Sequence, residues 1–246
     1  MSTSERLEER NQRTFVRIAE SGLIGLDFVD KQFGYDFYPP QTIQPFAVID
    51  SLVRSGLAAP TLAVTAFDLS PRVNAHLAAA RVRSTAGTGY TMVLPRDVDQ
   101  AWSPELIEYW MRFGQAIGQE GRTPAPPGNA GHVQVRSVAI RPAVVTQVSS
   151  RDLDIVLDRV ESSTAAERFD LVIATNVLLY YDVFEQSLAV ANIAKMLRSG
   201  GLFLSNDRVF ELPAGPVAAV GFTDVRYTTQ AATVEKGDRI TWYQRR

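Results

Sequence analysis

Two places in the chain set polar residues directly after short apolar runs. Asp68 follows LAVTAF (Leu62–Phe67), and FDLVIATNVLLYYD (Phe169–Asp182) runs from the apolar Leu171–Ala174 into polar and aromatic residues. Such runs suit strands buried in a parallel sheet, and open α/β sheets bind ligands at the carboxyl ends of their strands. Because a carboxylate offers two acceptor oxygens to two adjacent hydroxyls, Asp68 is a candidate ribose ligand. The alternative is an Asp that only begins the next helix.

A strand, helix, strand unit surrounds the second run. Asp182 stands where a helix N-cap belongs, and a helix is predicted over Val183–Leu197, ended by Gly200 and Gly201. Leu202–Leu204 then starts another strand, so the crossover is expected to be right-handed. The apolar residues that recur at three- and four-residue steps, and are expected to cover the sheet, are Phe184, Leu188, Ala191, Ala194 and Leu197.

A matching unit lies upstream, after the first run. Ser70 is a predicted N-cap and Pro71 the first residue of a helix that runs to about Arg81. The apolar residues that this helix places on one side are Val73, Leu77 and Ala80.

The rest of the chain supplies further elements. We expect an amphipathic helix over Glu5–Ala19, a first strand within Gly22–Asp30 and a helix over Thr42–Val53. The residues of this last helix expected to face inward are Ile43, Phe46, Ile49 and Val53. A further helix is predicted at about Ser103–Ile117, and Gly221–Tyr227 with Arg239–Tyr243 are predicted to form an antiparallel edge pair.

These elements predict an α/β fold, a Rossmann-like doubly wound mixed sheet with an antiparallel C-terminal edge. We expect one domain over residues 1–246, with a helical or irregular extension over 1–40 and an insertion over 95–131 at the sheet edge. The aromatic residues of that insertion, which either form a lid or acceptor wall or only pack the helix onto the sheet, are Trp102, Tyr109, Trp110 and Phe113.

Composition narrows the function classes. A chain of 246 residues that is 46% hydrophobic can bury a full core, and its net charge of -2 argues against a nucleic-acid-binding surface. The absence of cysteine excludes disulfides and thiolate sites, and two histidines argue against a histidine metal centre or triad. No apolar run of about 18 residues and no signal-peptide pattern is present, so we expect a cytoplasmic protein without membrane contact. The oligomeric state is left open.

Four pieces in a fixed order point to one family. They are QPFAVIDSL (Gln44–Leu52), SPELIEYWMRFG (Ser103–Gly114), VQVRSVAIRPAVVTQVSSRDL (Val133–Leu153), and FDLVIATNVLLYYD followed by MLRSGGLFLSND (Met196–Asp207). Together, from about Gln41 to Asp207, they resemble the catalytic domain of the chemotaxis receptor glutamate methyltransferases, class I enzymes that use S-adenosylmethionine. The first glycine loop of that family is degenerate here, since Thr42 stands at the expected glycine and Tyr38, Pro39 and Pro40 precede it.

The resemblance implies a set of site residues. Asp68 would hold the ribose of S-adenosylmethionine, and Asn176 would lie beside its methionine part. The full set of implied cofactor-binding residues is Asp68, Leu69, Asp152, Leu153, Asn176 and Thr42, with Asp152 and Leu153 flanking the adenine. Tyr180 is the implied catalytic residue, because an aromatic face attracts the sulfonium and the phenol can orient the acceptor.

The resemblance also implies a reaction. Methyl transfer would leave S-adenosylhomocysteine, and it needs mainly alignment and exclusion of water. A carboxylate acceptor is already ionised at neutral pH and needs no general base, so we expect a small molecule or a protein carboxylate as acceptor. Two alternatives stay open: a non-catalytic relative kept as a binding or scaffold protein, and another α/β enzyme. A reductase is disfavoured because no Gly-x-Gly-x-x-Gly turn is present.

Overall fold

The structure is a computed structural model of the whole chain. It describes residues 17–21, 42–58, 62–99, 102–123, 125, 132–162, 164–175, 177–206, 209, 215–226 and 237–246.

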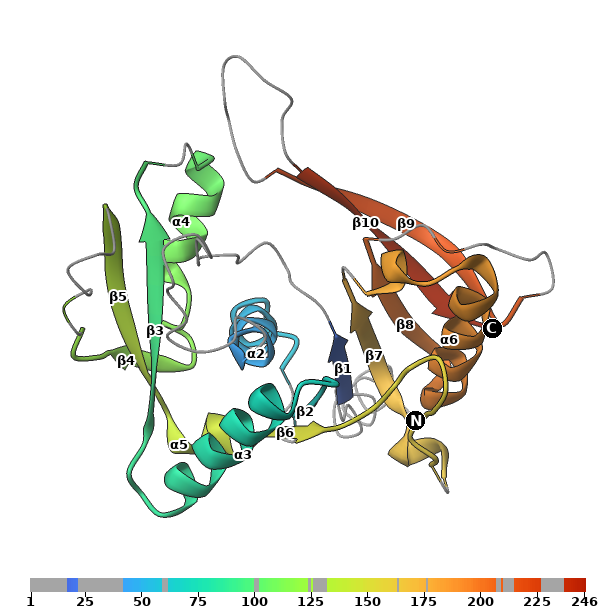
Figure 1. Cartoon of the computed structure of the whole chain (residues 1–246), viewed down its shortest axis with the longest axis horizontal. Helices are drawn as coiled ribbons and strands as arrows, with labels where there is room; N and C mark the ends of the chain where they lie inside the picture. Colours follow the sequence, from blue (N-terminus) through green and yellow to red (C-terminus); the bar gives the residue numbers. More distant parts are fainter. Residues whose placement is uncertain are drawn as a thin grey trace, which may run out of the picture.

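A seven-stranded mixed sheet runs from the middle of the molecule to its right-hand side in Figure 1. In spatial order its strands are β6 (Val148–Arg151), β2 (Ala63–Phe67), β1 (Arg17–Ser21), β7 (Phe169–Ala174), β8 (Leu197–Ser205), β10 (Gly237–Arg245) and β9 (Val217–Arg226). The strands from β6 to β8 are parallel, whereas β10 is antiparallel to both β8 and β9. The α/β fold and the antiparallel C-terminal edge are therefore confirmed.

The other parallel strands lie on both sides of β1. Numbered within this sheet alone, the parallel strands stand in the order 3-2-1-4-5, which is the order of doubly wound nucleotide-binding folds. The direction in which the chain adds strands reverses between β1 and β7. Ligands of such sheets bind outside the carboxyl ends of the strands at this reversal, so a site is expected there.

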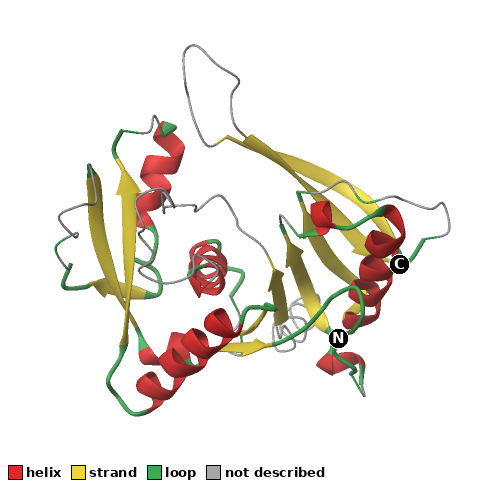
Figure 2. Cartoon of the chain, viewed as in Figure 1, coloured by secondary structure: helices red, strands yellow, loops and turns green. Residues whose placement is uncertain are grey.

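Helices cover both faces of the sheet (Figure 2). On one face, α2 (Gln44–Arg54) and α3 (Pro71–Thr85) pack with Val64 and Ala66 of β2. On the other face, α6 (Val183–Met196) packs with Val172 and Phe203. The expected N-terminal ends of α3 and α6 at Ser70 and Asp182 are confirmed, and Asp182 forms a reciprocal capping box with Glu185.

A second, antiparallel sheet was not foreseen. It has the order β3 (Tyr90–Asp97), β5 (Val133–Ile140) and β4 (Gly118–Glu120). Residues 42–50 are all buried, because α2 lies between this small sheet and β2 within one apolar cluster (Figure 1). Trp110 and Phe113 belong to the same cluster, with Trp102 and Tyr109 packed against it, so these aromatics pack the insertion onto the core.

Asp50 joins α2 to the insertion through a buried carboxylate. Its Oδ1 accepts from the backbone N–H groups of Gly114 and Ala116, both at 3.1 Å, and its Oδ2 accepts from Arg54 at 2.8 Å. The side chain is 1% exposed. A buried carboxylate must be hydrogen-bonded to offset the loss of its hydration, and these bonds hold the turn that follows α4 (Pro104–Arg112).

Several boundaries differ from expectation. Residues 17–21 form strand β1, so the predicted helix over Glu5–Ala19 is wrong for its last residues; the rest of that helix and Gly22–Asp30 lie outside the described residues. The helix predicted to Ile117 ends at Arg112, since Gly114 turns the chain with φ +89°. Val53 is 37% exposed and does not face inward.

The expectation for α6 was wrong in two ways. The helix ends at Met196 and not at the two glycines, because Leu197 already pairs with Phe169 in the sheet. Of the residues predicted to face the sheet, Ala194 and Leu197 are buried, whereas Phe184 is 71% and Leu188 38% exposed. The residues of α6 that are buried are Ala189, Val190, Ile193, Ala194 and Met196.

Candidate functional site

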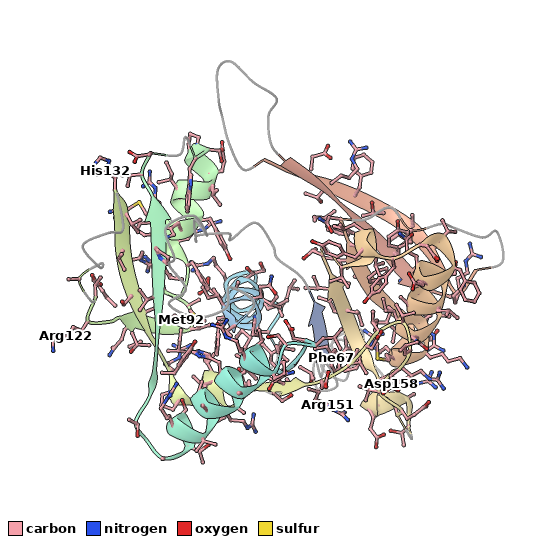
Figure 3. The ribbon with its side chains drawn as sticks, in the orientation of Figure 1. Phe67, Met92, Arg122, His132, Arg151 and Asp158 are labelled. Atoms are coloured by element: carbon pink, nitrogen blue, oxygen red, sulfur yellow. The ribbon has the colours of Figure 1, made fainter. Side chains whose placement is uncertain are left out.

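Asp68 and Asp152 meet at the carboxyl edge of the main sheet. Phe67 pairs with Arg151 at the ends of β2 and β6, and the Asp68 N–H donates to the Arg151 carbonyl at 3.2 Å. Figure 3 labels Phe67 and Arg151 at this edge. The residues that follow the two strands, Asp68 and Asp152, are therefore neighbours, as both predicted roles require.

The two carboxyl oxygens of Asp68 differ in their hydrogen bonding. Oδ1 accepts from the Ser70 N–H at 2.7 Å, while within the described residues Oδ2 accepts no hydrogen bond. Burial raises the pKa of Asp68, the Ser70 N–H opposes this, and the negative charge of Asp152 adds to the rise. A half-buried carboxylate with an open oxygen is suited to accept a hydrogen bond from a hydroxyl group of a ligand.

Asn74 fixes the loop that carries Asp68. Its side-chain Nδ2 donates to the backbone carbonyl of Asp68 at 2.7 Å, and its backbone carbonyl accepts from Ser150 Oγ at 3.2 Å. Helix α3 is thereby tied to the ends of β2 and β6. Asn74 was not predicted from the sequence, although a polar residue one turn into a helix after such a strand is a signal for this contact.

The loop after β6 is held in a similar way from the other face of the sheet. Asp154 Oδ1 accepts from the Val156 N–H at 2.9 Å, and Asn192 of α6 donates to the carbonyls of Ile155 and Val156 at 2.9 and 3.0 Å. This places Asp152, which is exposed, and the half-buried Leu153 on a loop fixed at its far end. Neither Asp154 nor Asn192 was predicted.

The end of β7 presents a buried hydroxyl and an exposed phenol. Thr175 is 2% exposed, and its Oγ1 lacks a hydrogen-bond partner within the described residues. Tyr180, on the short helix Leu178–Tyr180, is 77% exposed. Asn176 lies outside the described residues, so its predicted place beside the cofactor stays a prediction.

The remaining predicted residues, Leu69 and Thr42, lie in different places. Leu69 is 56% exposed beside Asp68. Thr42 is 0% exposed in front of α2, within the packed region between the two sheets. The structure thus brings Asp68, Leu69, Asp152 and Leu153 together, and places Tyr180 across β1 from them. Two strand spacings, about 10 Å, separate the ends of β2 and β7.

Other kinds of site find no support in the described part of the chain. No group of three or more His, Asp or Glu residues there is placed to hold a metal ion. None of the helices described is both long and apolar enough to cross a membrane.

Comparison with known proteins gives distant likenesses only. No family model and no curated protein sequence matches. Among solved structures, N-methyltransferase NodS from Bradyrhizobium japonicum is 15% identical with a TM-score of 0.41, covering 100% of this chain and 99% of that one. A TehB-like SAM-dependent methyltransferase from Corynebacterium glutamicum is 9% identical with a TM-score of 0.41, covering 98% and 86% of the two chains.

A third solved structure is of the same kind. Magnesium protoporphyrin IX methyltransferase from Synechocystis, with bound SAM, is 10% identical with a TM-score of 0.40, covering 99% of this chain and 76% of its own. Overlaps this low carry no argument about activity. A functional assignment therefore rests on the strand order of this chain and on the residues at the carboxyl edge of its sheet.

Proposed function

We propose that this chain is an S-adenosylmethionine-dependent methyltransferase that acts on a small molecule or on a carboxylate acceptor. The observation that carries the proposal is the pair of acidic residues, Asp68 and Asp152, that the β2–β6 pairing sets at the carboxyl edge of a doubly wound sheet. The order of sequence motifs that resemble class I methyltransferases supports the same function.

The residues present suit an adenosyl group. Asp68 has an open carboxylate oxygen for a ribose hydroxyl, and Asp152 on the next loop can accept from the adenine amino group. The Thr175 hydroxyl, which lacks a hydrogen-bond partner within the described residues, adds a buried donor at the end of β7. These are hydrogen-bonding groups that a nucleoside satisfies without any metal ion.

The chain has little covalent chemistry to perform. When bound, S-adenosylmethionine supplies a methyl group on a sulfonium that is displaced in line. The protein holds the nucleoside at Asp68, beside the loop that Asn192 fixes, and orients the acceptor from the side of Tyr180. The exposed Tyr180 phenol can donate to an acceptor oxygen, which suits a carboxylate that requires no general base.

A scaffold function is the second candidate, and one observation favours it. Thr42, which the resemblance places at the cofactor, is 0% exposed and precedes a helix whose residues 44–50 are all buried. A chain closed at this point would keep the sheet and lose the cofactor.

Calorimetric titration with S-adenosylmethionine and S-adenosylhomocysteine separates the two candidates. The methyltransferase proposal expects micromolar binding that weakens at least about tenfold in Asp68→Ala, since a hydrogen bond to a charged group contributes about 1.5–3 kcal/mol. Asp99→Asn is the matched control, because Asp99 is an exposed acid paired with His132 far along the chain from Asp68. Heat that is absent from the unmodified chain at millimolar cofactor would leave the scaffold function as the better account.

A further inference from the structure

The outer surface of α6 carries an apolar stripe. Phe184 is 71% exposed and Leu188 38% exposed, and the half-buried Ala191 and exposed Lys195 continue the same line. At about 100° per residue these four positions fall within about 60° of one another. The buried residues Ala189, Val190 and Ile193 lie on the opposite side, against the sheet. The stripe therefore lies on the side of α6 away from the core.

The spacing along the stripe is that of a helix-pairing seam. Positions 184, 188, 191 and 195 are separated by steps of four, three and four residues, the heptad spacing by which two helices pack together. Leu179 and Val183, just before and at the start of the helix, are also exposed, by 50% and 61%. Exposed apolar side chains grouped on one helix face are typical of interaction sites.

The stripe is complementary to itself when two copies run antiparallel. A two-fold axis between positions 189 and 190 places Leu188 opposite Ala191, a large side chain against a small one. The same axis places Phe184 opposite the aliphatic stem of Lys195. The residue types thus match across a symmetric contact, as an isologous interface requires.

The charges match as well. Asp182 and Glu185 lie in the first turn of α6, and Lys195 lies in its last turn. In the antiparallel arrangement each Lys195 ammonium faces the acidic first turn of the other copy, whereas a parallel arrangement brings like charges together. Two antiparallel helices also oppose their dipoles favourably.

We propose that α6 is a homodimer contact in which a second copy of this chain packs antiparallel on the stripe Phe184, Leu188, Ala191 and Lys195. The contact is small, so the dimer is a weak, concentration-dependent one. This inference does not depend on the proposed function.

Cross-linking tests the arrangement directly, because the chain has no cysteine of its own. A mixture of Phe184→Cys and Lys195→Cys chains, treated with a short bifunctional maleimide, is expected to give a covalent dimer of the two variants. Each variant alone is expected to give little dimer, since positions 184 lie about 16 Å apart along an antiparallel pair. Efficient cross-linking of each variant with itself, or none in the mixture, would overturn the antiparallel arrangement.

Sedimentation velocity over a wide concentration range tests the contact without labels. The unmodified chain is expected to shift from monomer to dimer, and Leu188→Glu is expected to raise the dissociation constant at least about tenfold, because a buried unpaired carboxylate opposes association. Val82→Glu is the matched control, since Val82 is an apolar residue 68% exposed on another helix. A chain that stays monomeric at every concentration, or equal effects of the two variants, would contradict the proposal.

Discussion

Asp68 and Asp152 are adjacent because their preceding residues, Phe67 and Arg151, are paired partners in parallel strands. The charge of Asp152 adds to burial in raising the pKa of Asp68 above its ordinary value of 3.8. The negative charge of Asp152 thus disfavours the ionised form of Asp68. A ligand that donates hydrogen bonds to both would relieve that repulsion.

The Asp152→Asn variant is expected to lower the pKa of Asp68. The substitution removes one of the two contributions that raise it, while burial of Asp68 and its bond from Ser70 stay the same. Titration of the Asp68 side-chain carboxyl by NMR measures the change. An Asp68 pKa that is unmoved or higher in Asp152→Asn would show that the two charges do not interact.

The raised pKa of Asp68 has a definite sign for stability and for binding. The folded chain holds the Asp68 proton more tightly than the unfolded chain, so this residue contributes stability below pH 3.8, and that contribution is lost as pH rises through the raised pKa. On the proposed function, cofactor binding is expected to have the opposite pH dependence, because the charged carboxylate is the stronger hydrogen-bond acceptor. Calorimetry at decreasing pH, starting from neutral, is expected to show the affinity for S-adenosylhomocysteine falling at a pH above the ordinary pKa of Asp. In Asp152→Asn the affinity is expected to fall at a lower pH than in the unmodified chain.

Replacement of Asp50 by Ala is expected to destabilise the fold strongly. It leaves the Gly114 and Ala116 N–H groups without their acceptor and Arg54 without its ion partner. Each N–H group left without an acceptor costs about 1–3 kcal/mol, whereas loss of the ion pair costs less because Arg54 is 32% exposed. Urea unfolding measures the loss, with Asp50→Asn expected to lose less because one acceptor oxygen remains. Asp99→Asn, at an acid 67% exposed, is expected to stay within about 0.5 kcal/mol of the unmodified chain.

The wrong prediction for α6 shows what periodicity cannot supply. The recurrence of Phe184, Leu188 and Ala191 is real, but Ala189, Val190 and Ile193 form a second apolar face on the same helix. Helical spacing alone does not say which of two apolar faces meets the sheet. The choice is made by packing against Phe169, Phe203 and Tyr243, which lie in other parts of the chain.

The small sheet was missed for a related reason. Strand β3 pairs with β5 across 36 to 50 residues of sequence, Asp97 with Val133 at one end and Tyr90 with Ile140 at the other. Nothing local in Tyr90–Asp97 specifies that partner. By contrast, Asp68 was predicted as a site residue because its signal is local: an acid directly after a buried strand and before a capped helix. Its adjacency to Asp152 follows only once β6 is known to pair with β2.

His76 is expected to make stability depend on pH. Burial, with the nearby charge of Arg83, lowers the pKa of His76 below 6.5, and its ring bonds to the Tyr90 hydroxyl at 3.0 Å. A lowered folded pKa means that stability is present above pH 6.5 and is lost as pH falls through the folded pKa. Urea unfolding between about pH 7.5 and 5.5 is expected to show this loss, and a smaller one in His76→Phe. The exposed His132 serves as the control position.

Replacement of Gly114 by Ala is expected to destabilise the chain for two separable reasons. Gly114 has φ +89°, and an added Cβ would lie 2.7 Å from Val138 Cγ1. Gly56→Ala isolates the first reason, since Gly56 has φ +68° with nothing within 4 Å of the Cβ position. The conformational cost at each site is about 1–2 kcal/mol, and the clash adds about 1–3 kcal/mol at Gly114 alone.

A double-mutant cycle with Val138→Ala checks the second reason. Removal of the two Val138 methyl groups is expected to relieve the clash, so the double variant Gly114→Ala with Val138→Ala loses less stability than the sum of the single variants, by at least about 0.5 kcal/mol. Urea unfolding of all four chains gives the coupling. Additive losses would mean that the turn moves away from β5 to make room, and that the bonds from Gly114 and Ala116 to Asp50 do not hold it in place.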